Sequence, residues 1–258
     1  MKLSGAFTAI CGIILFLSCS IKEDRSGCPC RLVLDFSKVD TSVVTSVDML
    51  VTASDGFVFR KTIPVEEFAS PYTVSVPRGE VNVSGFSGAD GYVGEDGALS
   101  IPEGDLCPRV NMYNSKVMAD AELVRDTVAL HKNHSVMTIF IESEEDFPFR
   151  ISVTGYVDGY DPDGHPSEGA FRYSPQKDDD GSYAVSVPRQ VDNSLRLEVN
   201  DGMDVLKVFA LGEYLHMSGF DWEAGDLEDV TVSLDYSLTR LSLIVEGWDE
   251  EYFFEVVI

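Results

Sequence analysis

The sequence is poor in the residues from which most catalytic and metal sites are built. Its 258 residues include four histidines and five cysteines, and 19 basic residues stand against 44 acidic ones. The sequence has no Gly-rich phosphate loop and no Gly-x-Ser-x-Gly turn. A net charge of −25 repels nucleic acid and anionic lipid headgroups, so we expect no nucleic-acid partner. These shortages favour a protein that is not an enzyme and that carries no cofactor or metal.

Long apolar runs are also lacking, apart from one at the N-terminus. The run over 6–17 is shorter than the about 20 residues that a membrane-spanning helix needs. Lys2 precedes it and small residues end it, which is typical of a secretory signal peptide over 1–18. The ending Leu-Ser-Cys19 resembles a bacterial lipobox, although Phe16 stands where that pattern prefers leucine. We therefore expect Cys19 to be the lipidated first mature residue. An ordinary signal peptide cut elsewhere is the alternative.

A short polar segment follows the expected lipid site. Lys22, Glu23 and Asp24 resemble the surface-export signal of Bacteroidetes lipoproteins, in which acids follow a lipidated cysteine. A plain solvated linker is the alternative. We treat 19–27 as a tether and these three residues as a candidate export signal, which predicts a surface-exposed protein lipid-anchored in the outer membrane.

Three cysteines remain after the signal and the lipid site. Cys28 and Cys30 are too close to pair comfortably with each other, and Cys107 lies far along the chain. In an oxidising compartment, a bridge from either one to Cys107 would close a loop of about 80 residues, worth roughly 4 kcal/mol in the chain-entropy model. All three are candidates for that bridge. A Cys-Pro-Cys metal site lacks a second ligand cluster in the sequence.

Strand signals dominate the mature chain. Short runs rich in β-branched and aromatic residues alternate with Gly, Pro, Ser and Asp turns, and helical periodicity of any length is absent. A single helical turn is expected over 64–70. The expected strands lie at 31–36, 47–53, 57–63, 72–76, 80–86, 127–131, 135–142, 149–157, 182–187, 194–199, 204–211, 229–234, 240–246 and 252–258. Many short strands at close spacing predict an all-β fold of sandwiches.

The chain repeats itself. Tyr-x-Val-Ser-Val-Pro-Arg begins at Tyr72 and again at Tyr183, 111 positions later. A looser echo pairs the segment 128–143 with 232–247, 104 positions later. Two matches in the same order indicate two copies of one module. Acidic residues and Pro148 separate strand signals near 142–149, so we expect one sandwich over 28–145 and a second over 146–258.

Two other residue groups were considered as sites. Asp158, Asp161 and Asp163 offer carboxylates for a weak calcium ion, but clusters of Asp with Gly or Pro are more typical of turns. His131 and His134 are three apart at an expected hairpin turn, where exposed histidines are the simpler interpretation. A pair of carboxylates for glycoside cleavage cannot be selected from sequence alone.

The N-terminal pattern resembles a known family. A lipobox cysteine, a short link and then Cys-Pro-Cys-x-Leu-x-Leu-x-Phe over 28–36 are similar to the start of the Mfa2/FimB family, the fimbrial anchor lipoproteins of Bacteroidales. The resemblance implies two tandem transthyretin-like β-sandwich domains that hold the base of a fimbrium, or pilus, at the outer membrane, without enzymatic activity. It also implies strand exchange with a fimbrial shaft subunit, which is β-augmentation in physical terms.

Other functions stay open at this stage. A surface lipoprotein that binds glycan for an uptake system would need exposed aromatics for stacking, and the sequence offers Trp222, Trp248, Tyr156 and Tyr160. An adhesin at a fimbrial tip is a third possibility. The last segment, 252–258, either donates a strand outward or completes the second sandwich.

Overall fold

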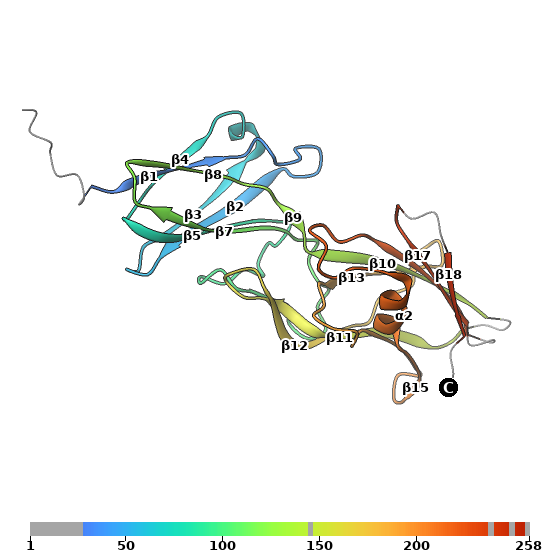
Figure 1. The fold of residues 1–258 in the computed structure, drawn as a ribbon. Coiled ribbons are helices and arrows are strands. Elements are labelled where there is room, and N and C mark those ends of the chain that lie inside the picture. Colours follow the sequence, from blue (N-terminus) through green and yellow to red (C-terminus); the bar gives the residue numbers. More distant parts are fainter. Residues whose placement is uncertain (1–27, 144–146, 237–239, 248–250, 256–258) are drawn as a thin grey trace, which may run out of the picture.

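The computed structural model describes residues 28–143, 147–236, 240–247 and 251–255. The described chain forms two lobes in a row, with β1 in the lobe at one end and β18 at the far end of the other (Figure 1). Both lobes are β-sandwiches, so the predicted all-β fold with two tandem sandwiches is confirmed.

The first sandwich consists of two facing sheets. In the smaller sheet, β1 (Cys30–Asp35) lies between β4 (Tyr72–Val76), which is antiparallel to it, and β8 (Leu123–Thr127), which is parallel. The larger sheet has the order β3-β2-β5-β7-β9. Its strands are β2 (Ser46–Ala53), β3 (Val58–Pro64), β5 (Gly79–Ser87), β7 (Asn111–Ala119) and β9 (His131–Lys132). Leu32, Leu34 and Phe36 are all buried in the first core, as their alternation predicts.

The second sandwich also consists of two facing sheets. One sheet has the order β13-β10-β16-β17-β18 and the other the order β12-β11-β14-β15. The short strand β6 (Leu99–Ser100) pairs with β11 in antiparallel orientation. The strands are β10 (His134–Glu142), β11 (Arg150–Tyr160), β12 (Pro166–Tyr173), β13 (Tyr183–Pro188), β14 (Arg196–Asn200), β15 (Val205–Phe209), β16 (Val230–Asp235), β17 (Arg240–Val245) and β18 (Glu251–Glu255).

In their equivalent strands, the two sandwiches have the same strand order and the same pairing of strands. β10 pairs with β13 antiparallel and with β16 parallel, as β1 does with β4 and β8. The facing sheets follow the same order, with β12-β11-β14-β15 matching β3-β2-β5-β7. The repeated Tyr-x-Val-Ser-Val-Pro-Arg segment lies on β4 in one sandwich and on β13 in the other. The internal repeat in the sequence therefore corresponds to a repeated fold.

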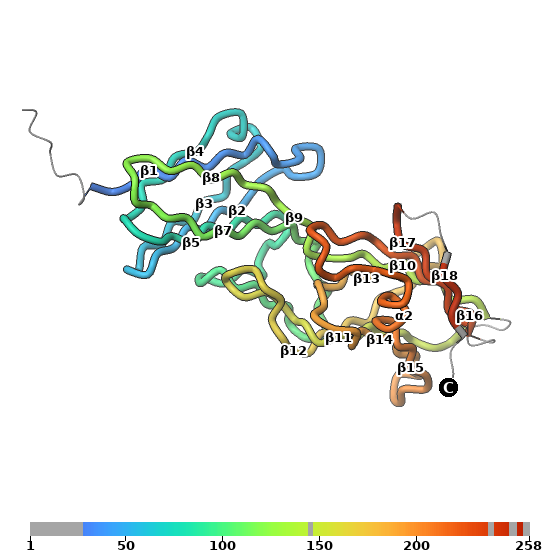
Figure 2. Tube along the Cα trace, in the orientation of Figure 1, coloured from blue at the N-terminus to red at the C-terminus, as the bar shows by residue number. Residues whose placement is uncertain are grey.

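The pairing of the strands bears on where the first sandwich ends and the second begins. β10, which precedes the expected boundary at 145/146, is a central strand of the second sandwich. The chain passes from β8 through β9 into the second lobe (Figure 2). We propose that the boundary lies at Asn133, between β9 and β10. The long connection between β5 and β7 also reaches into the second sandwich, because its residues Leu99, Ile101 and Cys107 are buried in the second core.

The described part of the chain contains one helix that the sequence pattern does not predict. Residues 204–211 were expected to form one strand, but β15 ends at Phe209 and α2 (Leu211–Ser218) follows at once. Leu211, Leu215 and Ser218 are buried on one side, and Gly219 ends the helix with φ of 90° while its N–H bonds the carbonyls of the last turn. Two turns are too short for a clear periodicity. The expected turn near 64–70 is present as a 3₁₀ turn, η2 (Val65–Glu67).

Candidate functional site

The start of the folded chain is held by the arginine of the first repeat. Arg78 follows β4 and donates from Nε to the carbonyl of Cys28 at 2.8 Å, and from Nη1 to the carbonyl of Asp120. Cys28 lies just before β1, and Asp120 lies between β7 and β8. One guanidinium therefore joins the chain segments that lead into two neighbouring strands. This is the junction between the expected tether and the first sandwich.

The second repeat uses its arginine in the same way. Arg189 follows β13 and donates from Nε to Asn133 Oδ1 at 3.1 Å, directly before β10. Its other nitrogens donate to the carbonyls of Trp222, Ala224 and Gly225, which precede β16. Burial lowers the pKa of this guanidinium from a value far above neutrality, so it stays charged. The shared arginine of the repeat thus closes the same end of both sandwiches.

The opposite end of the molecule is formed by β17 and β18. β18 is the last strand of its sheet and pairs with β17 alone among the described strands. Phe253 is 75% exposed, whereas Phe254 faces inward and stacks on Tyr214 of α2 with ring centroids 4.9 Å apart. A hollow of about 440 Å³ runs beside these strands, with Arg240 and Phe253 in its lining. An outward aromatic on an open edge makes this end a surface suited to strand addition.

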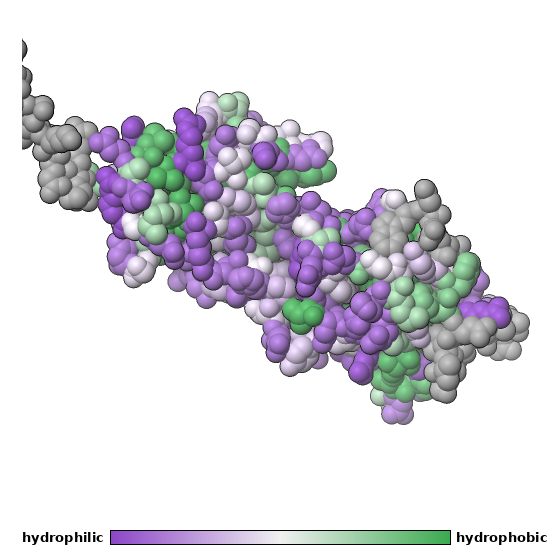
Figure 3. All heavy atoms as spheres, in the orientation of Figure 1, coloured by the Kyte–Doolittle hydropathy of each residue, from purple (hydrophilic) through white to green (hydrophobic). Residues whose placement is uncertain are grey.

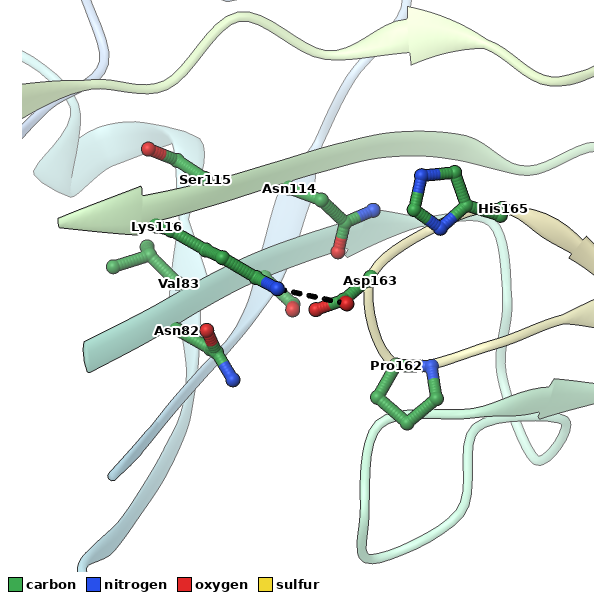
Figure 4. Close-up of a pocket in the computed structure, with 9 residues that line it drawn as sticks. Asn82, Val83, Asn114, Ser115, Lys116, Pro162, Asp163 and His165 are labelled. Atoms are coloured by element: carbon green, nitrogen blue, oxygen red, sulfur yellow. Dashed lines mark hydrogen bonds and ion pairs between the residues drawn. The ribbon is translucent and has the colours of Figure 1, made fainter. Parts of the chain in front are cut away.

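A polar pocket of about 300 Å³ lies where the two sandwiches meet (Figure 4). β5 and β7 supply Asn82 and Asn114 from the first sandwich, and the turn between β11 and β12 supplies Asp163 from the second. Lys116 Nζ and Asp163 Oδ2 are 2.9 Å apart across it (Figure 4). The hydrogen bond to the Asp163 carboxylate raises the pKa of Lys116, so this ammonium group stays charged at neutral pH. The Oδ1 atoms of Asn82 and Asn114 are buried without a hydrogen-bond partner among the described residues.

That pocket fixes the two sandwiches against each other. Gly164 has a φ of +86°, and a Cβ at this position would lie 2.1 Å from Asn114 Nδ2, so only glycine fits against β7. Asp161 shapes the same turn, because its Oδ1 accepts the backbone N–H groups of Asp163 and His165, both at 2.9 Å. Two of the three carboxylates named for calcium, Asp161 and Asp163, are thus used in the turn and in the ion pair. The described residues contain no cluster of three or more His, Cys, Asp or Glu side chains suited to a metal ion.

The three cysteines do not come together. Cys28, Cys30 and Cys107 are free thiols; Cys28 is exposed, Cys30 is buried in the first core, and Cys107 is buried in the second. The predicted bridge to Cys107 is therefore not formed in this structure, because the two buried thiols belong to different cores. Burial raises the pKa of Cys107 to about 12, which leaves it a thiol at neutral pH.

Other predicted surface residues are buried. His134 is 5% exposed, its Nδ1 lies 3.1 Å from the carbonyl of Val110, and burial lowers its pKa, so its expected exposure is wrong. Trp222 is 9% exposed and packs edge-to-face on Phe220, and Tyr160 is 1% exposed with its hydroxyl bonded to the carbonyl of Asn133. Neither can stack on a sugar. Tyr156 is half exposed.

Several predicted residues lie outside the described parts of the chain. They are Cys19, Lys22, Glu23, Asp24, Trp248, Val256 and Ile258. Among the helices of the described residues, none has both the length and the apolar character needed to cross a membrane.

Solved structures with the same fold come from species of Bacteroides and Porphyromonas. A candidate polysaccharide-binding protein of Bacteroides thetaiotaomicron is 14% identical, with a TM-score of 0.64, over 88% of this chain and 98% of that one. A candidate adhesin of Bacteroides ovatus is 13% identical, with a TM-score of 0.62, over 91% and 97%. The fimbrial anchor protein Mfa2 of Porphyromonas gingivalis is 10% identical, with a TM-score of 0.60, over 86% and 98%.

The chain has the fold of a fimbrial anchor protein. The resemblance to the Mfa2/FimB family that the N-terminal pattern suggests is therefore confirmed at the level of the fold. No family model matches the sequence, and no curated protein sequence matches it. The likeness extends over nearly all of each solved chain, so it includes both sandwiches and the connection between them.

Proposed function

We propose that this protein is an outer-membrane lipoprotein that holds the base of a fimbrium at the cell surface, without catalytic activity. The observation that carries the proposal is the shared two-sandwich fold, which covers 98% of the fimbrial anchor Mfa2. Two further structures of this fold are candidates for adhesion and for polysaccharide binding, which favours a role at the cell surface.

The arrangement of the two ends suits an anchor. The membrane attachment would be the lipid on Cys19, followed by a tether that leads to Cys28. Stable anchoring by acyl chains takes more than one chain, at about 0.8 kcal/mol per buried CH₂, and a triacylated cysteine supplies that. The sandwich that contains β1 lies at one end of the molecule and β18 lies at the other (Figure 1). The attached end and a binding end are thereby separated by the length of both sandwiches.

The shaft subunit would bind by strand exchange at the β18 end. β1 is unsuited to leave its sheet, because it is hydrogen-bonded on both sides and its inward side chains fill the first core. β18 is bonded on one side within the described chain and carries the outward Phe253. An added strand there would continue the five-stranded sheet.

Attachment is tested by changing Cys19 to Ala in the organism that makes the protein. The variant should lose its acyl label, leave the membrane fraction and release fimbriae into the medium. Deleting the gene should release fimbriae as well. Fimbriae that stay attached after the deletion would refute the anchor function, and a wild type retained without an acyl label would refute the lipid site.

Surface exposure is tested separately. Protease added to intact cells should digest the wild-type protein. The Lys22→Ala, Glu23→Ala, Asp24→Ala variant should be lipidated but protected. Equal digestion of both forms would show that these three residues are only a linker.

A further inference from the structure

A hollow of about 470 Å³ in the second sandwich has an unusual lining. It lies beside β11 and β12, near the start of β13, and it includes Arg150, Arg172 and Lys177 but no aspartate or glutamate. The whole chain has 44 acidic residues against 19 basic ones, so a wall with three cations and no acid runs against its composition. Positive charge gathered in a concave surface attracts anions more strongly than the same charges on a flat one.

The three cations differ in how they are held. Arg172 Nη2 lies 2.9 Å from Glu198 Oε2, and the Glu198 side chain is only 14% exposed, so this pair holds the Arg172 side chain in place. Arg150 and Lys177 are exposed and form no ion pair with another described residue. Two of the three charges are therefore available to a ligand, next to one that is fixed.

Neutral hydrogen-bonding groups stand beside these cations. Ser152 Oγ and Ser174 Oγ are 2.8 Å apart, and Asn200 Nδ2 donates to Ser152 Oγ at 3.3 Å. All three residues line the hollow. Hydroxyl and amide groups both donate and accept hydrogen bonds, as the hydroxyl groups of a sugar do. A guanidinium binds a carboxylate or a sulfate through paired N–H groups.

The fold itself does not require cations at this corner. The offset of 111 that aligns Tyr72 with Tyr183 also aligns Pro64 with Pro175, and it places Glu66 where the second sandwich has Lys177. In the first sandwich, Lys61 corresponds to Arg172 and is neutralised by Glu67 at 3.2 Å. The same offset aligns Glu67 with Asp178, and both copies have a cation at the position of Lys61 and Arg172. Lys177, which stands where the first sandwich has Glu66, is therefore the cation that distinguishes this site from its counterpart.

We propose that this hollow binds an acidic saccharide, with Arg150 and Lys177 contacting its carboxylate or sulfate groups. Ser174 and Asn200 would contact its hydroxyls, and Ser152, which is 2% exposed, holds these two side chains in place from behind. The volume fits a short segment of such a chain, within the range of small-molecule sites. This binding activity goes beyond the anchoring function and does not depend on it.

The test compares two trisaccharides with the same linkage that differ at C6, where one carries a carboxylate and the other a neutral hydroxymethyl group. The full-length protein, purified in detergent, is titrated by calorimetry with α-1,4-linked trigalacturonic acid and with the neutral α-1,4-linked galactotriose. The acidic ligand should bind and the neutral one should bind at least roughly tenfold more weakly, which corresponds to about 1.4 kcal/mol. Equal affinity for both, or no binding of the acidic one, would overturn the proposal.

Two double variants locate the site. Arg150→Ala with Lys177→Ala should weaken trigalacturonic acid binding by roughly tenfold or more. Lys38→Ala with Arg125→Ala removes the same charge from exposed positions of the first sandwich and should leave the affinity unchanged. Equal loss in both double variants would mean a general charge effect and would refute the site. Heptaglutamate that binds the wild type as tightly as the saccharide would refute the assignment to a sugar.

Discussion

At the scale of single residues, the repeated arginine explains why one short motif occurs twice. Arg78 and Arg189 each follow a strand that ends in Val-Pro, and each donates to the segments that precede two neighbouring strands. The proline ends the strand, and the arginine that follows occupies the open end of the sandwich. The motif is therefore a closure of the module and does not mark a binding site.

Replacing Arg78 with Ala should lower the stability of the protein. The two carbonyls of Cys28 and Asp120 lose a charged donor, which is worth about 1–2 kcal/mol for a half-exposed group. Thermal unfolding followed by circular dichroism should show a melting temperature lower by roughly 3–6 °C. Arg125→Ala, an exposed change on β8, is the control and should melt like the wild type. An unchanged melting temperature for Arg78→Ala would contradict the closure role.

The thiols should differ in reactivity. Cys28 is exposed and should react with iodoacetamide in the native protein, whereas Cys107 should not, because burial raises its pKa to about 12. Cys30 is also buried and should stay unlabelled until denaturant is added. Mass spectrometry of labelled peptides before and after unfolding checks this. A disulfide between Cys107 and either other cysteine would show that the predicted bridge exists after all.

Residue types predicted strands better than they predicted exposure. The inward positions of β1 follow from alternation alone, because a strand places every second side chain on one face. The burial of His134 and Trp222 does not, because both contact distant segments: His134 lies beside the carbonyl of Val110, and the carbonyl of Trp222 accepts a hydrogen bond from Arg189. A local pattern contains no information on such contacts.

At the scale of elements, the two echoes in the sequence had different outcomes. The first places β4 and β13 at equivalent positions. The second aligns β10 with β17, yet β17 returns beside β16 while β10 leaves the first sandwich and starts the second. Strands with similar sequences thus have different pairing partners, because β10 begins the second sandwich, whereas β17 follows its neighbour β16 within that sandwich. For this reason the sequence echo does not locate the boundary that we propose at Asn133.

β18 offers a pair of neighbouring phenylalanines that separate binding from folding. Phe253→Asp changes an outward side chain and should alter stability by no more than about 0.5 kcal/mol. Phe254→Asp places a charge against Tyr214 and should cost about 2–3 kcal/mol. If β18 is the joint with the shaft, Phe253→Asp should release fimbriae while the purified variant keeps its circular dichroism spectrum. Fimbriae that stay attached would exclude Phe253 from the joint.

At the scale of the whole molecule, the sandwiches are joined by more than a linker. The connection between β5 and β7 places Leu99 and Ile101 in the second core, and the Lys116–Asp163 pair joins the two lobes. The visible surface is mostly hydrophilic, with an apolar patch near β15 (Figure 3). Leu206 and Val208 are among the exposed apolar residues of that strand. The sequence predicted two modules, but the way they join depends on contacts between residues far apart in the chain.

Cutting the chain at the boundary expected from sequence should therefore fail. The fragment 146–258 lacks β10, the strand between β13 and β16, and should show no cooperative thermal transition. The fragment 88–258 keeps β10 and the crossing connection, and it should unfold cooperatively. Circular dichroism melts of the two fragments check this. A cooperative transition in 146–258 would restore the boundary at 145/146.

The position of β1 within its sheet has a mechanical consequence for a protein that is pulled by its ends. A pull on Cys28 acts along the axis of β1, so the ladders to β4 and β8 are loaded in shear and their bonds must yield together. A pull across the edge strand β18 would peel its single ladder one bond at a time. Under tension, the anchored end should therefore outlast the far end. If the protein anchors a fimbrium as proposed, a fimbrium that breaks away should leave the first sandwich of this protein folded on the cell.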